Sequence, residues 1–186
     1  MKVSILYSSK TGNTRKLAYS IANELSDFEI TITDIKTMES LPQADAYLIG
    51  YWVDKAQPNE EAKHCIEQIT GKPVGLFGTL GAYAYSSHGS QSMQNANAML
   101  GEGCTLIGSF LCQGPVDPKL LERFKSLPPD NPHALTTEKK LRHKVAALHP
   151  NDLDAKYAAH SYLENDWNNY HKRALLPRGR ALFCLY

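Results

Sequence analysis

The chain has 186 residues, of which 42% are hydrophobic and 21% charged, and its formal net charge is +1. This length and apolar content suit one globular domain with a sizeable core, and they exclude a chain that is disordered throughout. A nearly neutral chain is also not expected to bind nucleic acid, because that requires a basic surface facing the phosphate backbone.

Several absences bear on where the protein works. No run of residues approaches the roughly 18 apolar residues needed to cross a bilayer, and the first residues lack the features of a signal peptide. The four cysteines include no CxxC pair, and the histidines show no HExxH arrangement. We therefore expect a cytoplasmic protein with reduced thiols, no membrane span and no metal site.

Strand-like and helix-like patterns alternate through the first part of the chain. Apolar or alternating runs predict strands at residues 1–7, 29–34, 46–50, 73–79 and 105–113. Apolar residues at helical spacing predict helices at residues 14–25, 59–69, 88–100 and 118–125. Strands joined by helical crossovers predict an α/β fold with three layers, a doubly wound five-stranded parallel sheet covered on both faces. Such sheets bind ligands beyond the carboxyl ends of their strands, where the strand order reverses.

A Pro-rich stretch at residues 127–132 predicts a boundary between residues 1–127 and a linker with a helical C-terminal extension at 128–186. Residues 1–132 carry 11 Lys and Arg against 14 Asp and Glu, whereas residues 133–186 carry 9 against 5.

The extension is predicted to contain a helix at 141–148, after a cap at Thr136, and a long helix at 153–174. The long helix is expected to bury one face, formed by Leu153, Tyr157, His160, Trp167 and Ala174. That face either docks on the chain's own domain or serves as a lid, a dimer contact or a dock for a partner.

Residues 8–14 connect the first predicted strand to the first predicted helix. Hydroxyl side chains and one glycine, delivered onto a helix N-terminus, present converging N–H and O–H donors to an anion such as phosphate. The alternative is an ordinary turn, in which Gly12 and Asn13 supply positive φ and Thr14 caps the helix. Nucleotide motifs of fixed spacing are absent, since no GxGxxG follows the first strand and Gly71-Lys72 precedes a proline.

The segment from Tyr7 to Thr14 resembles the phosphate loop of the flavodoxin family. It matches at Ser9, Thr11, Gly12, Asn13 and Thr14, and departs at Lys10, where many members carry a hydroxyl residue. The resemblance covers residues 1–127 and implies strand order 2-1-3-4-5, with FMN as the cofactor.

Aromatic residues follow the third and fourth predicted strands, at residues 50–55 and 78–85. Trp52 and Tyr83 are candidates for the two faces of a sandwich around the flavin ring, as the family resemblance also implies. The alternative is that Tyr51 or Trp52 ends its strand inside the core and that Tyr85 lies on the surface. The expected FMN-binding residues are therefore Ser9, Lys10, Thr11, Gly12, Asn13, Thr14, Tyr51, Trp52, Val53, Asp54, Thr79, Leu80, Gly81, Ala82 and Tyr83.

Two functions stay open, and no catalytic acid, base or nucleophile is identified for either. The chain is either an electron-transfer protein that meets redox partner proteins transiently, or an FMN-dependent reductase acting on a small acceptor such as a quinone or tetrapyrrole. Residues 52–55, 78–83 and 149–151 are similar to those of short flavodoxin-like proteins of anaerobic bacteria, some of which assist bilirubin reduction. This resemblance favours an electron donor to a partner reductase.

Overall fold

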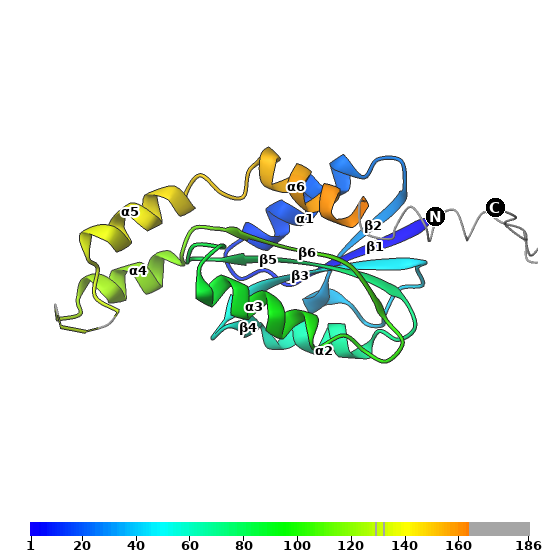
Figure 1. Cartoon of the computed structure of the whole chain (residues 1–186), viewed down its shortest axis with the longest axis horizontal. Helices are drawn as coiled ribbons and strands as arrows, with labels where there is room; N and C mark the ends of the chain where they lie inside the picture. Colours follow the sequence, from blue (N-terminus) through cyan, green and yellow to red (C-terminus); the bar gives the residue numbers. More distant parts are fainter. Residues whose placement is uncertain (129, 132, 164–186) are drawn as a thin grey trace, which may run out of the picture.

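The sheet has the topology that the sequence predicts. The computed structural model describes residues 1–128, 130–131 and 133–163 (Figure 1). The parallel strands are β1 (Lys2–Tyr7), β2 (Glu29–Asp34), β3 (Ala46–Asp54), β5 (Pro73–Leu80) and β6 (Thr105–Gln113). They lie in the order β2-β1-β3-β5-β6. The two-residue strand β4 (Gln57–Pro58) lies outside this order and pairs only with β3. The predicted doubly wound α/β fold is confirmed.

Six helices are described, of which the first three and the last cover the two faces of this sheet, while the fourth and fifth project beyond the carboxyl ends of its strands (Figure 1). They are α1 (Asn13–Glu24), α2 (Glu60–Gln68), α3 (Ser87–Asn97), α4 (Pro118–Lys125), α5 (Thr137–Ala146) and α6 (Asp152–Tyr162), with a short 3-10 turn, η1 (Ile35–Thr37). The helices expected before residue 127 are present with small shifts at their ends. Thr136 caps α5 as predicted, its hydroxyl accepting a hydrogen bond from the Lys139 amide at 3.2 Å. Within the described ranges, every helix is too short or too polar to span a bilayer.

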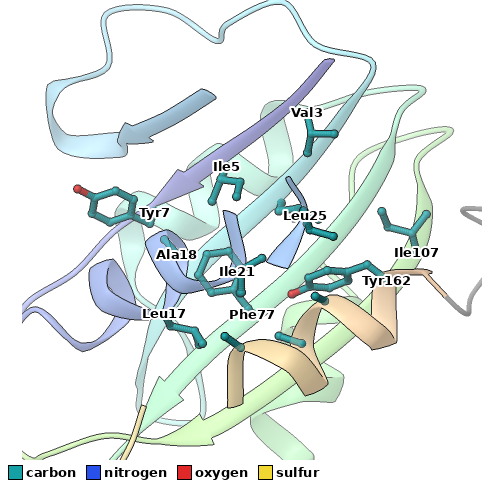
Figure 2. Packing of buried hydrophobic residues seen from close by; sticks show 14 of the residues in the cluster. Val3, Ile5, Tyr7, Leu17, Ala18, Ile21, Leu25, Phe77, Ile107 and Tyr162 are labelled. Atoms are coloured by element: carbon teal, nitrogen blue, oxygen red, sulfur yellow. The ribbon is translucent and has the colours of Figure 1, made fainter. Parts of the chain in front are cut away.

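Two hydrophobic clusters hold the layers together. Alternate residues of β1 point to opposite faces, so that Ile5 packs with α1 and α6 while Leu6 packs with α2. Figure 2 shows the first cluster, in which Leu17 and Ile21 of α1 lie near Tyr162 of α6. The loops at the carboxyl ends of the strands form the site.

Helix α6 is an integral layer of the fold, and Tyr162 fixes it to the sheet. The Tyr162 side chain is 1% exposed, and its hydroxyl donates to the Leu76 carbonyl at 3.2 Å. A Cβ at Gly108 would lie only 2.7 Å from the Ser161 carbonyl oxygen, so the absence of a side chain there lets the helix approach β6 closely. Of the alternatives considered for this helix, docking on the chain's own domain is what the structure shows.

The face of this helix expected to be buried was predicted wrongly. Leu153 and Tyr157 are 56% and 57% exposed, and His160 is also exposed, whereas Ala155 and Ala158 face the core. Small side chains are favoured at this interface because the helix backbone lies so close to the sheet. Trp167 and Ala174, and the rest of the predicted helix beyond residue 163, lie outside the described residues.

Strand β3 continues past its predicted end at residue 50. It runs to Asp54, turns at Lys55 and Ala56, and pairs with β4 in a two-residue hairpin. Both turn residues have positive φ, 50° for Lys55 and 62° for Ala56. This conformation matches the strand twist but strains residues that carry a Cβ, and the turn contains neither the glycine nor the asparagine by which such hairpins are predicted.

Candidate functional site

The loop between β1 and α1 leaves the start of the helix without a side-chain cap. Gly12 occupies the N-cap position with φ +91° and, as a glycine, provides no side-chain cap to the first-turn amides. The Gly12 amide itself donates to the Ser9 hydroxyl oxygen at 3.1 Å. An uncapped helix N-terminus lined by hydroxyl groups is suited to binding an anion.

Asn13 braces this loop against the end of β6. Its side-chain amide donates to the Thr11 hydroxyl oxygen at 3.0 Å and to the Pro115 carbonyl at 2.9 Å. A Cβ at Gly114 would lie 2.8 Å from that amide nitrogen, so the contact depends on the glycine. Asn13 therefore joins two segments about 100 residues apart in sequence, at the carboxyl edge of the sheet.

Thr14 lies beneath the loop, and its hydroxyl is satisfied within the protein. The side chain is 1% exposed, shares a 3.0 Å hydrogen bond with the Thr79 hydroxyl and donates to the Tyr51 carbonyl at 3.4 Å. Through these bonds α1 is tied to the ends of β3 and β5. Thr14 supports the loop from below and does not line the cleft described next.

A cleft of about 560 Å³ lies at this edge of the sheet, within the ~300–1,000 Å³ range of small-molecule sites. Most of the sequence-predicted residues line it. These are Lys10, Thr11, Asn13, Trp52, Val53, Asp54, Thr79, Leu80, Gly81 and Ala82. The structure thus brings the loops after β1, β3 and β5 together around one cavity, as expected from a parallel sheet.

Trp52 offers a flat apolar surface in this cleft. The Lys10 ammonium nitrogen lies 5.1 Å from the centre of its ring, as in a cation–π contact. Its indole nitrogen is buried without a hydrogen-bond partner among the described residues. An unpartnered buried donor is costly, and a ligand that accepts from it would remove that cost.

Two of the predicted aromatic residues do not present their rings to the cleft. The Tyr51 ring is 1% exposed and packs in the core against Leu111, and its burial raises the pKa of its hydroxyl. Strand alternation explains this, because Tyr51 and Trp52 point to opposite faces of β3. Tyr83 is 38% exposed outside the cleft lining, and its carbonyl accepts from the Ser86 amide and hydroxyl.

Asn59 lies outside the cleft lining but supports two segments next to it, a role that sequence reasoning missed. Its side-chain oxygen accepts from the Trp52 amide at 3.1 Å, and its side-chain nitrogen donates to the Ser8 hydroxyl oxygen at 2.8 Å. These two bonds link the first loop to the strand that carries Trp52, and the Asn59 side chain that makes them is 2% exposed. The only available signal was a polar residue at a helix start, which also predicts an ordinary cap.

A second missed group comes from the segment after β6. The cleft is also lined by Lys55, His88 and residues 114–117, and by five residues of α4, α5 and the loop between them, which are Leu120, Phe124, His133, Arg142 and His143. Figure 1 shows α4 and α5 projecting beyond the carboxyl ends of the strands. We call these two helices and the described part of their connecting loop, residues 118–128, 130–131 and 133–146, the α4–α5 hairpin.

A family model described as a flavodoxin domain matches residues 4–162, which include the sheet, the cleft loops and α6. The chain belongs to the flavodoxin family. It is 33% identical over 172 residues to the flavodoxin-like domain-containing protein BilS of Clostridioides difficile (strain CD3), covering 89% of this chain and 96% of that protein. It is 30% identical to the protein of the same name from Clostridium symbiosum (strain WAL-14163), covering 83% of this chain and 90% of that protein.

Among solved structures, the flavodoxin of Fusobacterium nucleatum bound to flavin mononucleotide aligns with a TM-score of 0.49 and 14% identity. The alignment covers 88% of this chain and 95% of that chain.

Proposed function

We propose that this flavodoxin-family protein binds FMN in the cleft and passes electrons to a partner reductase in the cytoplasm. The observation that carries the proposal is the uncapped start of α1, which opens with the Trp52 surface onto one cavity. The residues present fit the cofactor, since the cleft offers anion donors at one end and an unpartnered indole donor in its wall.

The phosphate of FMN would be held by the loop formed by residues 9–13. The Ser9 and Thr11 hydroxyl oxygens already accept hydrogen bonds from within the loop, so each hydroxyl proton can be donated to a phosphate oxygen. The first-turn amides of α1 add further donors, and the Lys10 ammonium adds positive charge.

The flavin ring would lie against Trp52, with the backbone of residues 79–82 along its polar edge. Gly81 and Ala82 have small side chains, which let a ring approach their backbone closely. When bound, FMN supplies the electron-accepting and electron-donating chemistry, while the protein supplies binding, orientation and charge. Asn59 would hold the Trp52 segment at a fixed position relative to the phosphate loop.

A partner reductase is favoured over direct catalysis because FMN itself would carry the electrons, so that the protein has only to supply binding, orientation and charge. The relatives that carry the name BilS support a shared role with this chain. The second candidate, a reductase acting directly on a small acceptor such as a quinone or tetrapyrrole, is favoured by one observation. The α4–α5 hairpin extends the cleft beyond the three loops expected to hold FMN.

The test begins with the flavin-free protein, titrated with FMN and with riboflavin while tryptophan fluorescence and the visible flavin spectrum are followed. We expect FMN to bind at least tenfold more tightly than riboflavin, because only FMN carries the phosphate. The absence of FMN binding at high micromolar FMN concentration would refute the proposal. Rapid mixing of the FMN-loaded protein with NADH or NADPH then separates the two candidates, since direct oxidation of either would exclude a pure carrier.

A further inference from the structure

The α4–α5 hairpin gives the cleft a wall that the proposed FMN site does not need. The phosphate is assigned to the loop after β1, and the ring to Trp52 and the residues after β5. Phe124, His133, Arg142 and His143 lie on the remaining side of the same cavity. Their chemistry is therefore available to a second molecule.

Two polar groups on this wall lack partners. The Arg142 Nε and the His143 Nδ1 are buried, and neither has a hydrogen-bond partner among the described residues. Arg142 is a permanent cation. Burial, together with the charges of Arg142 and Lys139, lowers the pKa of His143, so this histidine is neutral at neutral pH. The wall thus offers one cation and one neutral hydrogen-bonding group.

A flat surface accompanies these groups. The rings of Phe124 and His133 stack with centroids 5.8 Å apart and an angle of 11° between their planes. The charges of the cleft favour an anion on this side. Of the four wall residues Phe124, His133, Arg142 and His143, none is acidic and Arg142 is a permanent cation.

We propose that this wall is a second binding site, which takes a planar molecule bearing a carboxylate or phosphate beside the flavin. Arg142 pairs with the anionic group, His143 hydrogen-bonds it, and the Phe124–His133 pair packs against the ring. The inference rests on the proposed function, because FMN must occupy the opposite side of the cleft. It assigns a chemical class, planar anions, to small molecules that meet the flavin in this protein.

The experiment titrates the FMN-loaded protein with 2-naphthoate, 2-naphthyl phosphate and uncharged 2-naphthamide, using calorimetry and the visible flavin spectrum. We expect at least one anion to bind about tenfold more tightly than the amide, as a charge-assisted hydrogen bond predicts. The carboxylate and phosphate arms show which anion is preferred. Arg142→Gln should abolish the preference and Arg142→Lys should keep part of it.

The matched control is Lys144→Gln, which removes the same charge from an exposed position on the same helix and should leave the preference unchanged. Circular dichroism and melting temperature show whether each variant is folded. Equal binding of anion and amide, or an Arg142→Gln variant that binds like the unmodified protein, would overturn the proposal. So would a tenfold loss of FMN affinity in Arg142→Gln, because Arg142 would then serve the cofactor.

The two proposals fail separately. If the unmodified protein binds no FMN, the proposed function falls, whereas Arg142-dependent binding of naphthoate to the flavin-free protein would still support the anion site. If FMN binds and naphthoate does not discriminate, only the second site is lost.

Discussion

Replacing Asn59 with alanine should weaken both the fold and the candidate site, because this side chain joins three segments. It accepts from the Trp52 amide at 3.1 Å and donates to the Ser8 hydroxyl at 2.8 Å and the Glu61 carboxylate at 2.6 Å. Ser8 is fully buried and Asn59 is 2% exposed. Alanine makes none of these bonds and leaves a small void where water has little access.

The magnitude follows from the partners left behind. Each net hydrogen bond is worth about 1 kcal/mol, and each buried group without a partner costs about 1–3 kcal/mol. Most of the cost comes from the buried Ser8 hydroxyl, which loses its hydrogen-bond partner. The Glu61 carboxylate is exposed and can accept hydrogen bonds from water instead. We therefore expect the free energy of unfolding to fall by about 3 kcal/mol. FMN affinity should also fall, since the loop and the Trp52 strand lose their link.

Urea unfolding of the flavin-free protein, followed by circular dichroism, measures the first effect without a contribution from bound cofactor. The control is Asn23→Ala, which replaces an exposed asparagine on α1 and should change stability by no more than about 0.5 kcal/mol. If Asn59→Ala unfolds within about 0.5 kcal/mol of the unmodified protein, the reasoning that makes this network a structural link is refuted.

Four further outcomes are expected. Ala56→Gly should raise stability by about 1 kcal/mol in urea unfolding, because φ is +62° there, and an unchanged or lower stability would show that the hairpin is not strained. Ala158→Leu should lower the free energy of unfolding by about 2–3 kcal/mol, because the larger side chain overpacks against the sheet, while Leu153→Ala, at an exposed position, should change it by no more than about 0.5 kcal/mol. A larger loss for Leu153→Ala than for Ala158→Leu would support the originally predicted buried face. The pKa of Glu61 is lowered in the folded chain by hydrogen bonds from its own backbone amide and from the Asn59 side chain, so its contribution to stability is present at neutral pH and is lost as the pH falls through the acid range. Glu61→Gln should therefore flatten the dependence of the unfolding free energy on acid pH. Parallel pH curves for the variant and the unmodified protein would contradict this. Burial raises the pKa of Cys65 to about 11 and also raises that of Cys112, so a thiol reagent should label both cysteines only when the protein unfolds. Rapid labelling of either cysteine in the native protein would show that the core opens.

The fold class could be predicted because its signals were local, whereas the strand order followed only from the resemblance to the flavodoxin family. Apolar periodicity located each strand and helix, and the loop from Ser8 to Thr14 carried a pattern specific enough to identify the family. The hairpin at Lys55 and Ala56 could not be predicted, since its turn uses residues that ordinarily avoid positive φ. The buried face of α6 was misjudged because large side chains were taken as the core side, whereas contact with Gly108 favours alanines.

The cleft was predicted on three sides and missed on the fourth. Sheet topology brings the loops after β1, β3 and β5 to one edge, so their residues could be named from the sequence. The α4–α5 hairpin follows β6 with no motif of its own, and the boundary predicted at residues 127–132 placed its two helices in different parts of the chain. Which side chains of a helix face a cavity depends on how that helix docks, and no sequence pattern specified this for Arg142 or His143.

The hydrogen bonds around the cleft show which parts are held in place before any ligand binds. Thr14 ties α1 to β3 and β5, Asn13 ties the loop to the end of β6, and Asn59 ties it to the Trp52 strand. Each bond uses a side chain that a purely functional interpretation would assign to the ligand. The donors left for an anion are therefore chiefly backbone amides and the Ser9 and Thr11 hydroxyl protons, positioned by a second layer of polar residues. We expect the proposed FMN site to lose affinity when Thr14 or Asn59 is replaced, even though neither side chain lines the cleft.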